Sequence, residues 1–214
     1  KGEIIKEYFF KQKIFNSDFT IDLSSGDIQY HQTNASKWKV TLVNTGLNSM
    51  TGGRLLRVNH CGEVCAQALY RGQRLSSKNE KNREFMEEAA SEETKHLGWC
   101  EKRLGELNTK PSILNPIFYA TSFFAGLVVG ATTDKFSLGF TAETERQVMA
   151  HLSKHISSLP SEDKKSKAIL DQMRLDEESH KDSAIERGGA ELPRGTKILM
   201  TLLSKVMTKT TYWV

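Results

Sequence analysis

The chain has 214 residues, of which 38% are hydrophobic and 26% are charged, which is enough for one sizeable folded domain. Its formal net charge is +4, and the absence of any recognisable nucleic-acid motif or of basic residues interleaved with aromatic ones argues against a nucleic-acid partner. The three cysteines, Cys61, Cys65 and Cys100, form no C-x-x-C pair, so their spacing excludes a zinc ribbon or thioredoxin-type site, and we expect reduced thiols.

The first fifty residues carry no helical motif. The stretches FTIDL, DIQYHQ and KWKVTLV, at 19–23, 27–32 and 37–43, alternate loosely between apolar and polar residues as strands do. We therefore expect residues 1–50 to form an N-terminal arm, either briefly ordered or largely irregular, that precedes a domain over residues 51–214.

From Arg54 onward, apolar residues recur at helical spacing, and proline and glycine mark the ends of the helices. Ser161 follows Pro160 and is predicted to cap the fifth helix. The predicted helices run at about 54–78, 80–107, 114–132 and 139–158, from Ser161 to Gly188-Gly189, and onward from Pro193.

Two of these helices are unusually apolar. The stretch 117–132 is apolar nearly all round, but it is shorter than the roughly 20 residues that a membrane-spanning helix needs. The helix after Pro193 has a wide apolar face, with Lys197, Lys205 and Lys209 elsewhere on it. Both helices, together with the mildly basic chain, favour contact with a membrane surface without spanning it.

One pattern occurs twice. Glu63 is followed about thirty residues later by Glu93-Thr94-Lys95-His96, and Glu145 is followed at similar spacing by Glu177-Glu178-Ser179-His180. The spacing fits an antiparallel helical hairpin, and the i, i+3 separation places each Glu and its His on one helical face. The doubled set predicts a centre of two metal ions, iron or manganese, inside a four-helix bundle.

The charges of this set also fit a pair of metal ions. Four ionised glutamates neutralise two divalent ions, whereas burying four carboxylates without metal is very costly. No catalytic side chain beyond the metal ligands is predicted. By analogy with other bundles of this kind, Glu93 and Glu177 bridge both metals, Glu63 and Glu145 each bind one metal terminally, and His96 and His180 each bind one.

Other acidic residues and histidines lie near the pattern. His60 falls beside the inward stripe of its helix, so we expect it behind the ligands or at the surface. His151 and His155 do not share the stripe of Glu145 and are expected at the surface. Glu92 and Glu178 each point about 100° away from their neighbouring ligand and are expected to be solvated or to lie behind the ligands.

Several segments closely resemble the demethoxyubiquinone hydroxylase family, and its bacterial members more than its mitochondrial ones. These segments match in order over about 54–214, whereas the first fifty residues do not resemble the family. They are RVNHCGEVCAQALYRGQ, EETKHLGWC, NPIFYATSFFAGLVVGATTDKFSLGFTAETERQV, MRLDEESHKDSAIERGG and KVMTKTTYWV.

The resemblance implies an all-α, ferritin-like four-helix bundle, here with two additional apolar helices. It implies a di-iron monooxygenase of ubiquinone biosynthesis that uses dioxygen to hydroxylate a prenylated demethoxybenzoquinol, 2-polyprenyl-3-methyl-6-methoxy-1,4-benzoquinol. The electrons would come from NADH or a reductase. The family's iron ligands fall on Glu63, Glu93, His96, Glu145, Glu177 and His180.

The expected location is the cytoplasmic face of the bacterial inner membrane, where the quinone substrate dissolves, with a homo-oligomer or a complex of ubiquinone-biosynthesis proteins as possible assemblies. The alternatives are another membrane-associated di-iron oxidase, a ferritin-like metal-storage protein and a lipid-binding scaffold without catalysis. A storage cage needs soluble outer faces, which the apolar helix at 114–132 does not provide. A scaffold has no need of six buried ligands.

Overall fold

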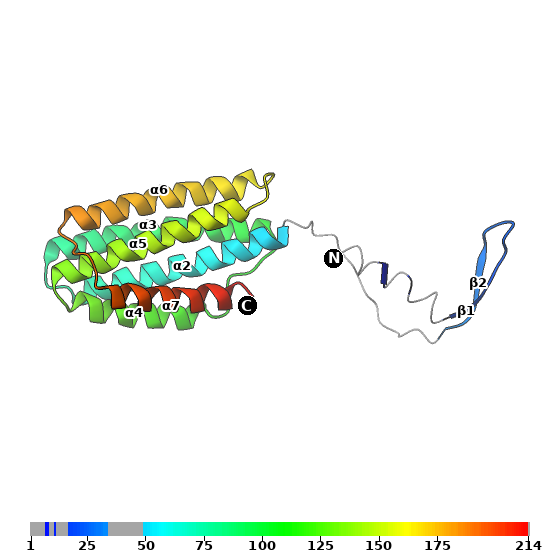
Figure 1. The fold of residues 1–214 in the computed structure, drawn as a ribbon, viewed down its shortest axis with the longest axis horizontal. Coiled ribbons are helices and arrows are strands. Elements are labelled where there is room, and N and C mark those ends of the chain that lie inside the picture. The colour runs from blue at the N-terminus through cyan, green and yellow to red at the C-terminus, as the bar shows by residue number, and fades with distance from the viewer. Residues whose placement is uncertain (1–6, 9–10, 12–16, 34–48, 214) are drawn as a thin grey trace. The chain divides into compact units, whose positions relative to one another are not determined.

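The computed structural model describes residues 7–8, 11, 17–33 and 49–213, and the chain divides into two units, residues 1–47 and 48–214 (Figure 1). In the first unit, β1 (Ser17–Ile21) pairs with antiparallel β2 (Ile28–Thr33), with an irregularity between Asp18 and Phe19. These strands overlap two of the three strand-like stretches in the sequence. The third stretch, 37–43, lies outside the described residues.

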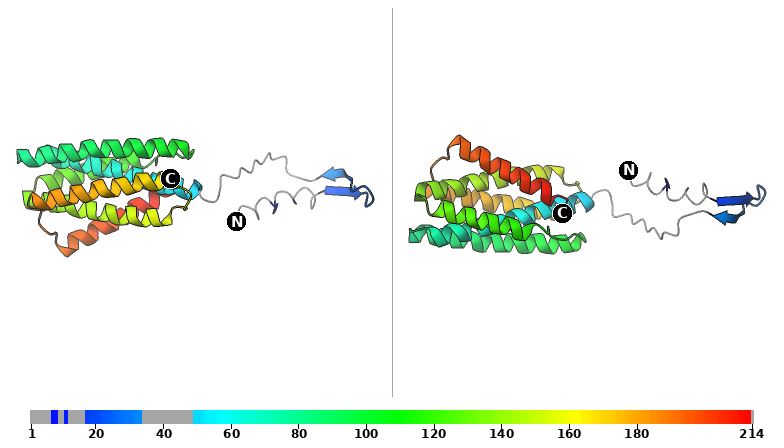
Figure 2. Two further views of the ribbon diagram at one scale, coloured as in Figure 1. Left: turned by 90° about the horizontal axis from the view of Figure 1, so that it is seen from above. Right: turned by 90° about the horizontal axis from the view of Figure 1, so that it is seen from below.

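Residues 49–213 form six helices, which confirms the all-α fold (Figures 1 and 2). Helices α2, α3, α5 and α6 make a four-helix bundle of two hairpins, in which α2 packs on α3 and α5 packs on α6. The two additional helices, α4 and α7, both contact α2 and α5. The bounds are α2 (Ser49–Ser76), α3 (Glu80–Glu106), α4 (Asn115–Gly130), α5 (Asp134–Ser158), α6 (Lys164–Glu186) and α7 (Arg194–Thr211).

Side-chain caps decide where several helices begin. Asn79 accepts a hydrogen bond from a backbone N–H in the first turn of α3, as expected at an N-cap. Thr133 does the same for α5, which is why that helix begins at Asp134, earlier than the predicted 139. The prediction that Ser161 caps the fifth helix is wrong, because Asp163 accepts from the N–H of Ser166 instead.

Helix α4 lies with its backbone directly against α2. A Cβ atom on Gly126 would lie 2.2 Å from the carbonyl oxygen of Leu69, so only glycine allows this approach. The small residues face α2, and larger apolar side chains therefore point outward: Phe124 is 65% exposed and Val128 is 70% exposed. No helix in the described part of the chain is both long and apolar enough to cross a membrane.

The bundle interior consists of two apolar layers with a polar layer between them. The layers draw residues from all four bundle helices, and in each helix the ligand candidates fall between the two sets along the sequence. One layer contains Ala66, Leu69, Tyr70, Phe85, Met86, Ala89, Ala90, Leu138 and Ala184. The other contains Leu56, Cys100, Leu104, Leu152, Leu170 and Met173. The apolar layers thus position and dehydrate whatever lies between them.

Candidate metal centre

The six residues of the doubled pattern are all buried in the polar layer. Helices α2 and α5 contribute one residue each, and α3 and α6, which carry Glu-x-x-His, contribute two each. They form two groups, in each of which one ligand atom per residue lies within 4.8 Å of the others. Glu93 and Glu177 belong to both groups, which is the position required of bridging carboxylates. The groups are Glu63, Glu93, His96 and Glu177, and Glu93, Glu145, Glu177 and His180.

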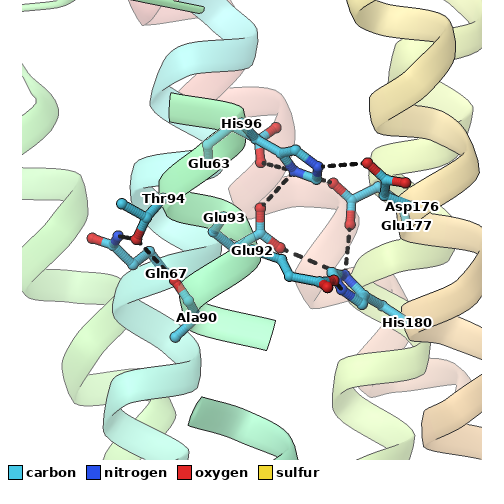
Figure 3. A network of polar contacts seen from close by, with 10 residues as sticks. All are labelled: Glu63, Gln67, Ala90, Glu92, Glu93, Thr94, His96, Asp176, Glu177 and His180. Carbon is cyan, nitrogen blue, oxygen red and sulfur yellow. Dashed lines mark hydrogen bonds and ion pairs between the residues drawn. The ribbon is translucent and has the colours of Figure 1, made fainter. Parts of the chain in front are cut away.

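The two histidine rings turn Nδ1 toward the carboxylates (Figure 3). Nδ1 of His96 lies 3.1 Å from Glu93 Oε2, 3.3 Å from Glu177 Oε1 and 3.4 Å from Glu63 Oε2. Nδ1 of His180 lies 3.2 Å from Glu177 Oε2 and 3.8 Å from Glu93 Oε1. The carboxylates and imidazoles therefore converge on a small region between α3 and α6. The carboxylates there would be stabilised by a positive charge.

Each ring uses its other nitrogen to bind a carboxylate on the opposite helix (Figure 3). Nε2 of His96 on α3 lies 3.1 Å from Asp176 on α6, and Nε2 of His180 on α6 lies 2.5 Å from Glu92 on α3. Such a partner fixes the ring and its tautomer, so that Nδ1 can bind a metal. Sequence reasoning missed Asp176, although an acidic residue immediately precedes the Glu of each Glu-x-x-His.

The pKa values in the centre depart strongly from ordinary ones. Burial, together with the charges of Glu177 and Glu63, raises the pKa of Glu93, and burial and Glu177 raise that of Glu145. Burial alone would raise the pKa of Glu177, but hydrogen bonds with His180 and His96 lower it to about 2. Without a cation, the cluster thus needs protons to offset its charge.

The histidines respond in the opposite sense. Burial alone would lower the pKa of His96, but contacts with Glu177, Glu63 and Glu93 outweigh burial and raise the pKa. The pKa of His180 is raised in the same way, by Glu177 and Glu92. The surrounding carboxylates therefore favour the protonated, positively charged form of each imidazole.

The donor set fits a pair of divalent iron or manganese ions. Both carboxylate oxygens of Glu145 are buried and lack a hydrogen-bond partner among the described residues. Buried oxygens of this kind are normally satisfied, and a bound cation would supply the partner that these oxygens lack. Carboxylates and imidazoles are suitable ligands for these metals. That the six residues bind metal stays a prediction.

The structure leaves His60 outside the ligand groups, as expected, and corrects the expected surface positions of two other histidines, His155 and His151. His60 is buried and lies 3.1 Å from the side-chain amide of Asn115 and 3.4 Å from Glu101, outside both groups of candidate ligands. His155 is buried too, so its predicted surface position is wrong, and His151 is half-buried, with Nε2 3.0 Å from Ser204 Oγ on α7. His151 is covered because α7 packs on α5, whereas His155 lies against Asn59 of α2.

A cavity of about 380 Å³ lies on the other side of the centre from the paired histidines, between α2, α4, α5 and α7. Glu63 lines it, so the cavity reaches the candidate metal ligands. Gly62 also lines it, and a Cβ atom there would meet no described atom within 4 Å. Most of the remaining wall is apolar, and its larger side chains are Leu69, Phe118, Phe140, Met200, Leu203 and Met207.

Comparison with family models matches residues 51–211 to the model described as "Ubiquinone biosynthesis protein COQ7". Proteins named 3-demethoxyubiquinol 3-hydroxylase are similar over most of their length. The one from Pseudomonas aeruginosa is 56% identical over 158 residues, which cover 74% of each chain. The one from Acinetobacter baylyi is 56% identical over 160 residues, 75% of this chain and 76% of the other.

Among solved structures, the fold is similar to a dodecameric thioferritin, the bacterioferritin-related protein from Bacteroides fragilis. The TM-score is 0.55 at 17% sequence identity, and the match covers 66% of this chain and 86% of the other. At this identity the likeness concerns the fold, and it confirms the ferritin-like arrangement of the bundle.

Proposed function

The chain belongs to the COQ7 family of ubiquinone biosynthesis proteins, and from this premise we propose that it hydroxylates 3-demethoxyubiquinol at a pair of iron ions held between its two helical hairpins. It is an oxygen-dependent hydroxylase of ubiquinone biosynthesis, and its relatives are named 3-demethoxyubiquinol 3-hydroxylase. The observation that carries the iron proposal is the pair of overlapping ligand groups that share Glu93 and Glu177.

In the proposed centre, Glu93 and Glu177 would be shared by both ions, and each ion would also have one histidine and one further glutamate. Glu63 and His96 belong to one group, and Glu145 and His180 to the other. Bound there, an iron pair would supply the dioxygen chemistry of a hydroxylation, in which one oxygen atom of O₂ is inserted into a ring C–H bond and the other is released as water after taking up two electrons and two protons from the reductant. The glutamates balance the charge of the ions, and the apolar layers on both sides keep bulk water away.

The outer carboxylates orient the ligands during this chemistry. Asp176 and Glu92 hold the Nε2–H groups of His96 and His180, which leaves both Nδ1 atoms free to bind. Because each carboxylate comes from the opposite hairpin, the contacts also tie α3 to α6 at the level of the centre. Electrons from NADH or a reductase would enter a site whose geometry is already fixed.

The quinol would occupy the apolar cavity beside Glu63. A volume of about 380 Å³ falls within the usual range for small-molecule sites and accommodates an aromatic ring with the first part of a prenyl tail. The mostly apolar wall suits a substrate that is hydrocarbon except at its ring oxygens. Residues of α4 and α7 line the cavity, and the outer faces of both helices also expose apolar side chains, so the tail would leave along these two helices.

These outer faces support the proposal that the enzyme binds the surface of a membrane, at the cytoplasmic face of the bacterial inner membrane. Leu199 and Leu202 on α7 are 57% and 54% exposed, and Phe124 and Val128 on α4 are exposed as well. Each large apolar side chain that inserts contributes on the order of 1.5–3 kcal/mol on full burial. Lys205 and Lys209 add attraction to anionic lipid of about 1 kcal/mol each.

Liposome flotation tests the membrane proposal. Wild type should float with vesicles that contain anionic lipid, and Phe124→Glu with Leu202→Glu should not float, because both side chains are exposed and neither lines the cavity. The matched control is Leu175→Glu with Ile185→Glu, two equally exposed apolar residues on α6, which should float like wild type. Equal flotation of both double variants, or none for wild type, would contradict the proposal.

The hydroxylase proposal is tested with iron-loaded protein, a demethoxyubiquinol, dioxygen and NADH or a chemical reductant. Mass spectrometry should detect a product heavier by one oxygen atom, with the label of ¹⁸O₂ when that gas is supplied. A protein that oxidises and stores iron in large excess without forming this product would instead be a storage protein, and the proposal would be wrong.

A further inference from the structure

The polar side chains that line the cavity differ in whether they already have a hydrogen-bond partner within the protein. The Thr121 and Thr144 hydroxyls donate to carbonyl groups of their own helices, and Gln147 donates to Glu143 at 2.7 Å. His151 pairs with Ser204. Asn59 is different, because its Nδ2 atom is buried and has no hydrogen-bond partner in the described part of the chain.

Asn59 is built into the wall next to the candidate metal centre. It lies one turn before Glu63 on α2, which places both side chains on the same face of that helix, and both residues line the cavity. Asn59 is only 5% exposed, so its unpaired donor has no bulk water to bind. A buried amide N–H without a partner is uncommon in proteins, and it points to a ligand that supplies the acceptor.

His155 fixes the orientation of this amide. Nδ1 of His155 on α5 lies 2.7 Å from Oδ1 of Asn59 on α2. Burial, with contributions from His151 and Lys154, lowers the pKa of His155 to about 4, so the ring is neutral at neutral pH. A neutral ring that donates from Nδ1 holds Oδ1 as the acceptor and leaves the NH₂ group of Asn59 for another partner.

We propose that Asn59, held by His155, is a positioning residue that donates a hydrogen bond to a ring oxygen of the quinone or quinol and sets the ring beside Glu63. This inference rests on the proposed function, since that function supplies the substrate class. The ring oxygens are the polar part of such a substrate, and the prenyl tail offers no acceptor. One fixed donor close to the centre would therefore decide which ring carbon faces the metals, while the apolar wall holds the tail.

Binding of a short-chain demethoxyquinone to iron-loaded protein, without dioxygen or reductant, tests the proposal. Asn59→Leu should weaken binding by roughly 10-fold, the usual size of one lost hydrogen bond to a buried group. Asn59→Asp keeps an acceptor for His155 but removes the donor, so it should weaken binding of the quinone as well. Neither variant should change the affinity for a prenylated arene that lacks ring oxygens. The same titrations on metal-free protein show whether the donor acts independently of iron.

Gln73→Leu is the matched control. Gln73 is also fully buried on α2 and also bonds across to α5, at Ser137 and Thr141, but it does not line the cavity. This variant should lose stability without a change in quinone affinity or in KM, whereas both Asn59 variants should raise KM for the quinol.

The outcomes separate the two proposals. If wild type hydroxylates the quinol while Asn59→Leu and Asn59→Asp bind the quinone as wild type does, the role of Asn59 is wrong and the proposed function stands. If the Asn59 variants weaken the quinone and the oxygen-free arene equally, the residue only shapes the cavity, and the inference is also overturned. If wild type neither binds nor hydroxylates the quinol, the proposed function fails, and the inference fails with it.

Discussion

The two sides of the candidate metal centre differ in how their polar groups are held. On the α3–α6 side, each histidine ring lies between glutamates and an outer carboxylate from the opposite helix, Asp176 or Glu92. On the α2–α5 side, both oxygens of Glu145 lack a hydrogen-bond partner among the described residues, and Glu63 borders an apolar cavity. The α3–α6 side is thus held by hydrogen bonds, whereas the α2–α5 side keeps unpaired oxygens beside a cavity, as the proposed ions and substrate require.

The largest effect should come from removing a ligand on the α2–α5 side. Glu145→Ala should reduce both iron binding and hydroxylation by roughly 100-fold or more, because even residues behind a metal ligand contribute about 10–100-fold. Glu178→Ala is the control, since neither ligand group contains Glu178. Elemental analysis and product formation measure both variants. Loss of iron in Glu178→Ala with retention in Glu145→Ala would show that the helical phase is misassigned.

On the α3–α6 side, we expect a smaller loss. Asp176→Asn and Glu92→Gln keep the size of each side chain but weaken its hold on His96 or His180, so the affinity for ferrous iron should fall about 10–100-fold. Competition with a chelator under anaerobic conditions gives the affinity. Wild-type affinity in both variants would mean that the outer carboxylates do not orient the rings.

Filling the cavity should lower the activity on the substrate without changing metal binding. Gly62→Val adds a branched side chain where a Cβ meets no described atom within 4 Å, so kcat/KM for a short-chain quinol should fall roughly 10-fold or more. Iron content should not change. Gly98→Val is the control, because Gly98 is an exposed glycine within α3 with equally open space. Equal kinetics for the two variants would place the substrate elsewhere.

The smallest effect concerns the stability of the metal-free protein. The raised pKa values of Glu93 and Glu145 contribute to the free energy of unfolding. This contribution is fully present below pH 4.5 and is lost as the pH rises through the raised pKa values. The raised pKa values of His96 and His180 act in the same direction above pH 6.5. The lowered pKa of Glu177, about 2, changes nothing in that range, because that carboxylate is already ionised there.

The melting temperature of metal-free protein should therefore fall between about pH 7 and pH 9, by roughly 4–8 °C, which corresponds to ~2 kcal/mol for a domain of this size. Calorimetry in matched buffers measures the change. Iron-loaded protein should show a smaller decrease, because the ions replace the protons, and Glu145→Gln should reduce the decrease as well. A melting temperature that rises over this range would contradict the assigned pKa directions.

Much of the fold and of the ligand set could be predicted because both depend on local periodicity. Apolar spacing located all six helices after residue 48, and the i, i+3 pairs placed Glu93 with His96 and Glu177 with His180 on inward faces. The doubled pattern also predicted that Glu63 and Glu145 belong to the same site. The structure places one of them in each ligand group, and their binding of metal stays a prediction.

The remainder depends on contacts between helices that periodicity does not specify. The phase of α5 relative to Glu145 suggested that His151 and His155 face solvent. Instead, α7 packs on α5 and covers His151, and Asn59 on α2 is the partner of His155. The pairing of Asp176 with His96 likewise joins two hairpins. The cavity arises from the placement of α4 and α7 against the bundle, which depends on glycines such as Gly126.

The most direct measurement of the central claim is the number of metal ions that the wild-type chain binds after anaerobic reconstitution. Elemental analysis should give about two iron ions per chain, as expected for a pair of ions bridged by Glu93 and Glu177. A single tightly bound zinc ion, or no metal at all, would contradict the account.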